Sequence, residues 1–319
     1  AGVTVVCENF FDTIEVAGVD AKEIQKKALA KGFNFFYTAE GNVRISFDEL
    51  SNCEEVQAVC EIFGCPEGCP VKQPEPAFIA RESEILTSPV FNTYHSETDM
   101  MRYIKKLERR DISLTQSMIP LGSCTMKLNA AVEMLPLSWS EFGNMHPYAP
   151  ADQAEGTLEM IHELEHDLAV ITGFDGCSLQ PNSGAAGEYA GLMTIRGYLL
   201  ANGGQNRNIM ILPTSAHGTN PASAAMAGFK IVLVSCYEHG NSNVDELREK
   251  ANAAGENLAG IMITYPSTHG VFEVKIREIV DIIHSNGGLV YMDGANMNAQ
   301  VGVTNPGFIG ADVCNLNLH

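Results

Sequence analysis

Tyr291-Met-Asp-Gly-Ala-Asn-Met-Asn-Ala299 completes a short apolar run that begins at Gly288. Such a run is typical of a buried parallel strand, and it places Asp293 at the carboxyl end of that strand, where ligands collect in open α/β sheets. A carboxylate buried there needs a cationic partner or several hydrogen bonds. The N-cap of a helix explains the same acid equally well. The segment therefore indicates either the floor of a ligand site or a helix cap.

Apolar strands and helices alternate on both sides of this segment, from residue 177 to residue 318. We predict helices that begin at Ser183, Pro221, Val244 and Ile276, and strands at 177–180, 209–212, 231–235, 260–264, 289–292 and 313–318. This alternation predicts an α/β fold whose sheet is mostly parallel and covered by helices on both faces.

The first part of the chain has a different pattern. A strand at 3–7, a helix at 21–30, strands at 33–37 and 43–47 and a second helix that ends at Gly64 predict a small α+β domain over residues 1–64. Recurring prolines predict a linker over 65–95, because proline continues neither a helix nor a central strand. Residues 96–319 then form a large domain, with helices at 96–110 and 152–172. Since a strand opens the chain, we expect the natural protein to begin upstream.

The composition excludes several functions. With 20 basic and 39 acidic residues, the net charge of the 319-residue chain is −19, which repels nucleic acid and anionic lipid. No apolar run reaches the roughly 18 residues of a membrane span. We expect a cytoplasmic protein, or a mitochondrial matrix protein if the source is eukaryotic, with its nine cysteines reduced.

Two groups of side chains bear on metal binding. Cys53, Cys60, Cys65 and Cys69 have four thiols, but their spacing is looser than that of structural zinc sites. His162 and His166 lie four residues apart on one predicted helix, without the glutamate of a zinc-protease motif. Buried thiols and solvent-facing histidines explain both groups, so we predict no metal site.

Three further loops follow predicted strands. Pro181-Asn-Ser-Gly-Ala-Ala-Gly187 places the N–H groups of small residues at a helix N-terminus, which favours an anion such as phosphate, although a tight turn explains it too. His217 lies in the loop Ser215-Ala-His-Gly-Thr-Asn-Pro-Ala222. We expect its ring either to stack on a flat ligand or to have only a structural role. In the same loop, Asn220 is the expected N-cap of the helix that follows. Tyr265-Pro-Ser-Thr-His-Gly270 follows another strand. Because these loops meet Asp293 at one sheet edge, a ligand site is favoured.

Four segments carry a resemblance to a known family. Together they closely resemble the glycine decarboxylase P-protein (glycine dehydrogenase, aminomethyl-transferring), over most of the chain from about residue 90. The segments are Ser117-Met-Ile-Pro-Leu-Gly-Ser-Cys-Thr-Met-Lys-Leu-Asn129, Gln180-Pro-Asn-Ser-Gly-Ala-Ala-Gly-Glu-Tyr-Ala-Gly191, Ser215-Ala-His-Gly-Thr-Asn-Pro-Ala-Ser223 and Tyr291-Met-Asp-Gly-Ala-Asn-Met-Asn-Ala-Gln-Val-Gly302. The resemblance implies the aspartate-aminotransferase-like, type I pyridoxal phosphate fold, and residues 1–64 then end the N-terminal half of a fused chain.

The resemblance also implies a cofactor site. Asp293 would pair with the pyridine nitrogen of pyridoxal phosphate and His217 would stack above the ring, and these two residues are the predicted catalytic ones. Ala295 would lie beneath the ring and Thr268 near its phenolic oxygen. The remaining implied residues surround the phosphate: Ser183, Gly184, Ala185, Asn317 and His319.

The implied reaction is decarboxylation of glycine on pyridoxal phosphate, followed by transfer of the aminomethyl group to the lipoyl arm of H-protein. The family implies a dimer. Its Schiff-base lysine follows the Asn-Leu-His run at which this sequence stops, so we expect weak, non-covalent cofactor binding at most and no activity. Two other readings are another type I pyridoxal phosphate enzyme, such as a cysteine desulfurase or aminotransferase, and a non-catalytic scaffold half.

Overall fold

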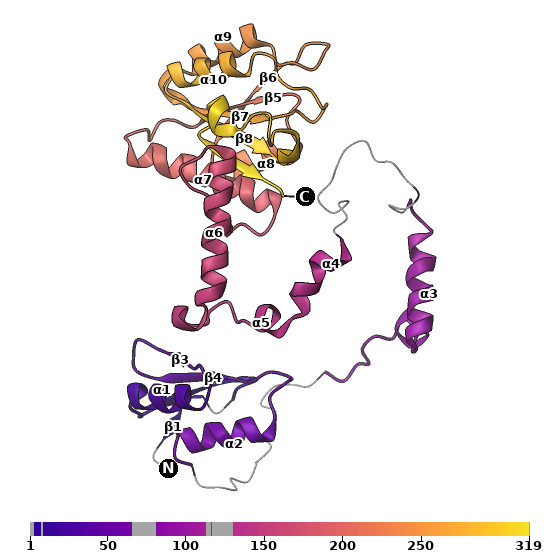
Figure 1. Cartoon of the computed structure of the whole chain (residues 1–319), viewed down its shortest axis with the longest axis vertical. Coiled ribbons are helices and arrows are strands. Elements are labelled where there is room, and N and C mark those ends of the chain that lie inside the picture. The colour runs from indigo at the N-terminus through magenta and orange to yellow at the C-terminus, as the bar shows by residue number, and fades with distance from the viewer. Residues whose placement is uncertain (1–2, 8, 66–80, 113–115, 117–129, 319) are drawn as a thin grey trace. The chain divides into compact units, whose positions relative to one another are not determined.

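The computed structural model describes residues 3–7, 9–65, 81–112, 116 and 130–318 of the chain (Figure 1). The chain divides into two compact units, Ala1–Asp111 and Ile112–His319. The predicted linker over 65–95 stays a prediction, because much of it lies outside the described residues.

The first unit contains a small antiparallel sheet with two helices. The order in the sheet is β1-β2-β4-β3. The elements are β1 (Thr4–Val5), β2 (Thr13–Ala17), α1 (Ala21–Ala30), β3 (Phe36–Tyr37), β4 (Val43–Ser46) and α2 (Cys53–Ile62). The α+β prediction is confirmed, but β2 was missed. Its residues Ile14 and Val16 pair with Ile45 and Val43 of β4, so this short strand is stabilised by a distant partner.

Local signals set the helix ends in this unit. Asp20 caps α1 by accepting hydrogen bonds from the N–H groups of Lys22 and Glu23. Further along, Ser96 caps α3 (Glu97–Glu108) by accepting from the N–H of Asp99. The second unit begins with short helical elements that precede α6 (Glu155–Thr172): α4 (Ala131–Met134), η3 (Leu135–Ser138), α5 (Ser140–Gly143) and η4 (Ala151–Gln153). The turn η1 (Pro89–Asn92) precedes α3.

The second unit has a five-stranded parallel sheet in the order β6-β5-β7-β8-β9. The strands are β5 (Ile209–Pro213), β6 (Lys230–Val234), β7 (Leu258–Thr264), β8 (Leu289–Gly294) and β9 (Val313–Leu316). The helices are α6 (Glu155–Thr172), α7 (Gly184–Ala201), α8 (Thr219–Met226), α9 (Val244–Ala254), α10 (Ile276–Ser285) and α11 (Pro306–Ile309), with the turns η5 (Gly255–Asn257) and η6 (Met297–Ala299).

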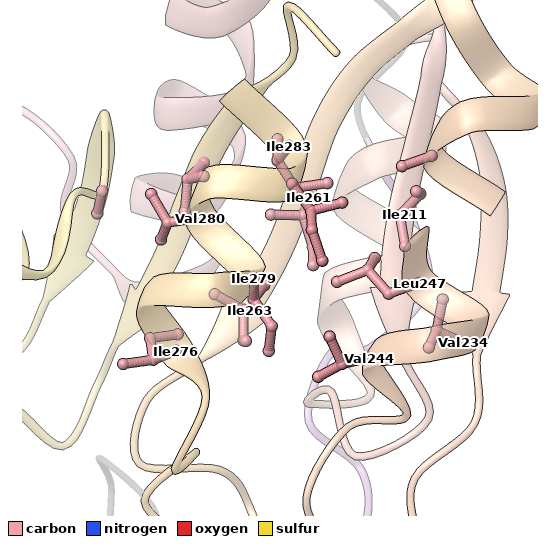
Figure 2. Close-up of a cluster of buried hydrophobic side chains, with 14 of the residues drawn as sticks. Ile211, Val234, Val244, Leu247, Ile261, Ile263, Ile276, Ile279, Val280 and Ile283 are labelled. Carbon is pink, nitrogen blue, oxygen red and sulfur yellow. The ribbon is translucent and has the colours of Figure 1, made fainter. Parts of the chain in front are cut away.

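Both faces of this sheet are buried. Ile261 and Ile263 of β7 lie in one cluster with Ile279 of α10 (Figure 2). Between them in sequence, Met262 belongs to a second cluster, which includes Leu192 of α7. Alternate residues of a strand point to opposite faces, so α9 and α10 cover one face while α7 and α8 cover the other. The predicted α/β fold is therefore confirmed.

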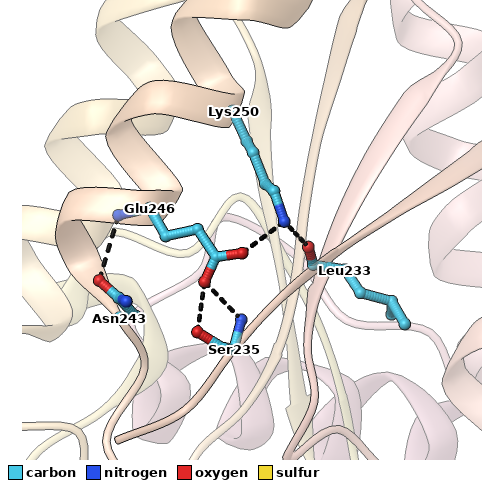
Figure 3. Close-up of polar contacts among 5 residues, drawn as sticks. All are labelled: Leu233, Ser235, Asn243, Glu246 and Lys250. Atoms are coloured by element: carbon cyan, nitrogen blue, oxygen red, sulfur yellow. Dashed lines mark hydrogen bonds and ion pairs between the residues drawn. The ribbon is translucent and has the colours of Figure 1, made fainter.

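A polar cluster joins α9 to the end of β6 (Figure 3). Glu246 accepts hydrogen bonds from Lys250, from the hydroxyl of Ser235 and, at 2.9 Å, from the Ser235 N–H. Asn243, the N-cap of α9, accepts from the N–H of Glu246 at 3.1 Å. The Lys250 hydrogen bond and then those from Ser235 lower the pKa of Glu246 to about 2.

The strand predicted at 177–180 is wrong. These residues have no ladder partner among the described residues, and the described sheet ends at β9. A strand needs a hydrogen-bonded neighbour, so the apolar character of the segment is not sufficient. The last strand is also shorter than predicted, since its pairing with β8 ends at Leu316.

Candidate functional site

Asp293 lies at the carboxyl end of β8 and is 4% exposed. Its Oδ2 accepts a hydrogen bond from Nδ2 of Asn220 at 3.1 Å, and its Oδ1 accepts from the N–H of Ala295 at 3.1 Å. It does not cap a helix: the turn that follows, η6, begins after Asn296. Within the described part of the chain, no lysine, arginine or histidine forms an ion pair with it. The site thus contains a buried acid that lacks a cation, which is costly unless a ligand supplies one.

Asn220 is a site residue that the sequence did not reveal. It was predicted as the N-cap of its helix, but α8 begins at Thr219 and its N-cap is Gly218. The Asn220 side chain is buried, with the residue 1% exposed, and donates to Asp293. Its Oδ1 has no hydrogen-bond partner. An asparagine before a proline is typical of a helix cap, so the local sequence did not predict the hydrogen bond from Asn220 to Asp293, 73 residues away.

The N-terminus of α7 is the predicted anion seat. Ser183 is its N-cap and accepts a hydrogen bond from the N–H of Ala186 at 3.2 Å. Among the described residues, no acceptor bonds to the N–H groups of Gly184 and Ala185. The free N–H groups and the positive end of the helix dipole favour a negative charge here.

His217 lies in the loop between β5 and α8 and is exposed. Its Nδ1 is 2.8 Å from Oγ1 of Thr219. The Thr219 hydroxyl donates to Oε1 of Glu188 at 2.7 Å, and the Ser223 hydroxyl donates to Oε2 of Glu188 at 2.8 Å. Glu188 belongs to α7 and is 5% exposed. The sequence analysis did not single out Glu188, whose contacts link the helix of the anion seat to the loop of His217.

Thr268 follows β7, and its hydroxyl donates to the carbonyl oxygen of Ser215 at 2.7 Å. This bond joins the loop after β7 to the loop that contains His217. The segment 117–129 and His319 lie outside the described residues. Asn317 follows β9, at the same edge of the sheet. The bonds of Asn220, Thr219 and Thr268 therefore bring three predicted loops and the start of α7 together.

A cavity of about 670 Å³ lies beside β9 and the start of α7. It is lined by Ser183, Gly184 and Asn317 among the predicted residues, and by the segment 176–179. Asp293, His217, Thr268 and Ala295 do not line it. The volume is that of a small-molecule site. The cavity therefore includes the predicted phosphate-binding residues Ser183 and Gly184 but not the hydrogen-bonded group around Asp293.

Burial controls the protonation of two groups near Asp293. Burial, followed by the negative charge of Asp293, raises the pKa of the Tyr291 phenol, and the same two causes raise the pKa of the Cys314 thiol. Both groups stay neutral at ordinary pH. The Tyr291 hydroxyl donates to Oδ1 of Asn315 at 2.7 Å.

Metal ligands are not grouped in the described residues, where no three His, Cys, Asp or Glu side chains are placed to hold an ion. His162 is exposed and lies 3.5 Å from Glu165. Cys69 lies outside the described residues. None of the described helices is long and apolar enough to cross a membrane.

The architecture defines the class of protein. A parallel five-stranded sheet covered by helices on both faces is the aspartate-aminotransferase-like, type I pyridoxal phosphate fold. A crystal structure of glycine decarboxylase (P-protein) of the glycine cleavage system, in inhibitor-bound form, matches with a TM-score of 0.58. The match covers 86% of this chain and 58% of the other at 16% identity, and it supports the fold alone.

Sequence comparison gives the family. The family model of the glycine cleavage system P-protein matches residues 72–315, and the chain belongs to that family. Glycine dehydrogenase (decarboxylating) of Christiangramia forsetii is 58% identical over 97% of this chain and 33% of its own length. The enzyme of the same name from Shewanella baltica is 53% identical over 100% of this chain and 34% of its own length. The chain spans about a third of the length of these curated relatives.

Proposed function

We propose that this chain forms part of a pyridoxal phosphate site at which glycine is decarboxylated. The observation that carries the proposal is the buried carboxylate of Asp293, which forms no ion pair among the described residues. Its partner Asn220 lies on α8, and Thr219 of α8 donates to Glu188 of α7, the helix whose N-terminus has free N–H groups. A protonated pyridine nitrogen would compensate the charge of this acid, and the phosphate of the same molecule would bind at the helix N-terminus. The residues present therefore fit the cofactor at both of its charged ends.

The proposed roles follow from these positions. Asp293 holds a proton on the pyridine nitrogen, while Asn220 and the N–H of Ala295 orient its two oxygens. Ala295 would lie beneath the ring and His217 above it. Ser183, Gly184 and Ala185 would bind the phosphate, with Asn317 and His319 nearby. For Thr268 to donate to the phenolic oxygen, its hydroxyl must rotate away from Ser215.

When bound, pyridoxal phosphate supplies an electron sink for the carbanion that decarboxylation leaves. The contribution of this chain is to position the ring and to keep its nitrogen charged. By family membership, the remaining roles proposed for the whole protein are glycine as substrate, transfer to the lipoyl arm of H-protein, a dimeric state and a cytoplasmic location.

A titration with pyridoxal phosphate tests this proposal. We expect saturable, reversible binding, measured by NMR shifts of residues around Asp293 and His217. Pyridoxal, which lacks the phosphate, is the matched control ligand and should bind at least 10-fold more weakly, because a charge-assisted hydrogen bond contributes about 1.5–3 kcal/mol. Equal affinity for the two ligands, or shifts confined to distant residues, would contradict the proposal.

A further inference from the structure

The proton positions around Thr219 can be deduced from the hydrogen-bond distances. An ionised glutamate only accepts hydrogen bonds, and a threonine hydroxyl has a single proton to donate. Thr219 Oγ1 lies 2.7 Å from Oε1 of Glu188 and 2.8 Å from Nδ1 of His217. If the hydroxyl proton is donated to Glu188, then Thr219 accepts its second hydrogen bond from His217. Nδ1 of His217 must in that case carry a proton.

A competing contact favours the opposite arrangement. The backbone N–H of Thr219 lies 3.3 Å from the same Nδ1, which would then be an acceptor. This contact is longer than the 2.8 Å between the same Nδ1 and the Thr219 hydroxyl, so it is the weaker of the two. A hydroxyl bond to a carboxylate is charge-assisted and roughly twice as strong as a neutral bond. The carboxylate of Glu188 therefore determines the direction of the chain of bonds.

The carboxylate of Glu188 is bound by protein groups rather than by water. The residue is 5% exposed, and the hydroxyls of Thr219 and Ser223 each donate to one of its oxygens. Removal of either donor would leave a buried carboxylate oxygen without that partner. Each oxygen of Glu188 thus has its own donor, and the oxygen that accepts from Thr219 does not depend on Ser223.

We infer that Glu188, acting through the Thr219 hydroxyl, fixes His217 as the tautomer with the proton on Nδ1. Glu188 is then a positioning residue. Within the described residues, no hydrogen bond reaches Nε2 of His217, so the unprotonated Nε2 is free to accept a hydrogen bond from a ligand. The consequence for the cofactor rests on the function proposed above; the tautomer itself does not.

Nitrogen NMR of the histidine side chains in the ligand-free chain tests the inference. The spectra are recorded at alkaline pH, where the shifts of the two ring nitrogens no longer change with pH and therefore report the tautomer. The His217 signal is assigned by its loss in His217→Asn. We expect Nδ1 to have the shift of a protonated nitrogen and Nε2 that of an unprotonated one. An unprotonated Nδ1 in the wild-type chain would overturn the inference.

Variants separate the contribution of Glu188 from general structural effects. Thr219→Val removes the hydroxyl and leaves only the backbone N–H at position 219, so the proton should move to Nε2; Thr219→Ser should keep it on Nδ1. Glu188→Leu has no acceptor for the Thr219 hydroxyl, which can then donate to Nδ1, so the proton should move to Nε2. Ser223→Ala, the matched control, should keep the proton on Nδ1. A proton that stays on Nδ1 in folded Glu188→Leu would refute the role of Glu188. Because no cofactor is present, failure of the cofactor proposal would leave this result unaffected.

Discussion

Replacing Asp293 by asparagine should separate stability from binding. The acid is 4% exposed, and its two hydrogen bonds, each 3.1 Å long, come from neutral groups. Burial of a carboxylate costs several kcal/mol, and two hydrogen bonds of about 1.5–3 kcal/mol each offset most of that cost. In Asp293→Asn the amide of Asn220 can turn, and its unpaired Oδ1 then accepts a hydrogen bond from position 293. We expect the free energy of unfolding to stay unchanged or to rise by up to about 2 kcal/mol.

Cofactor binding should change in the opposite direction. Loss of the bond to the charged pyridine nitrogen removes about 1.5–3 kcal/mol, which corresponds to an affinity about 10- to 140-fold lower at 1.4 kcal/mol per factor of ten. Urea unfolding followed by circular dichroism and the pyridoxal phosphate titration measure the two effects. Asp281→Asn, which removes an exposed acid of α10, is the control and should change neither. A variant at 293 that is less stable by more than about 1 kcal/mol and binds with unchanged affinity would refute the reasoning.

Three further predictions concern stability. Ile279→Ala truncates a side chain that is 0% exposed in the core shown in Figure 2. Urea unfolding should show that the free energy of unfolding falls by about 2–5 kcal/mol, and a decrease of less than about 1 kcal/mol would contradict this packing. In Gly191→Ala the added Cβ would lie 2.7 Å from Cε2 of Tyr291, so thermal unfolding should show a cost of about 1–3 kcal/mol, unlike Gly197→Ala, where nothing lies within 4 Å. Glu246 has a folded pKa of about 2, below its ordinary value of 4.5, so the stability it adds is present above pH 4.5 and is lost as the pH falls toward 2. The difference in melting temperature between the wild-type chain and Glu246→Gln should narrow over that interval, and a constant difference would exclude this cause.

Local patterns were sufficient for much of the fold. The helix predicted to begin at Ile276 does so and ends at Ser285, because Ile276, Ile279, Val280 and Ile283 repeat at helical spacing and are all buried. The helix predicted at 21–30 has the bounds of α1, and Asp20 in the position before it caps that helix. These features depend on residues within a few positions of one another. For that reason, the sequence alone predicts them well.

Non-local contacts account for the errors. The strand predicted at 177–180 has the right residues but no described neighbour with which to pair, and β2 was missed although β4 stabilises it. In the site, Asn220 and Glu188 contact residues 73 and 31 positions away. Nothing in the flanking sequence of either residue indicates these partners. The positions of Asp293 at the end of β8 and of Ser183 at the start of α7 were predictable because each lies at a recognisable junction of strand or helix.

The protonation state of the bound pyridine nitrogen tests the central claim most directly. The measurement is the nitrogen NMR shift of pyridoxal phosphate labelled at its ring nitrogen, recorded with the chain in excess and again with Asp293→Asn. We predict a protonated ring nitrogen in the wild-type complex and loss of that signal in the variant. An unprotonated nitrogen in the wild-type complex, or the same signal in both, would contradict the pairing of Asp293 with the cofactor.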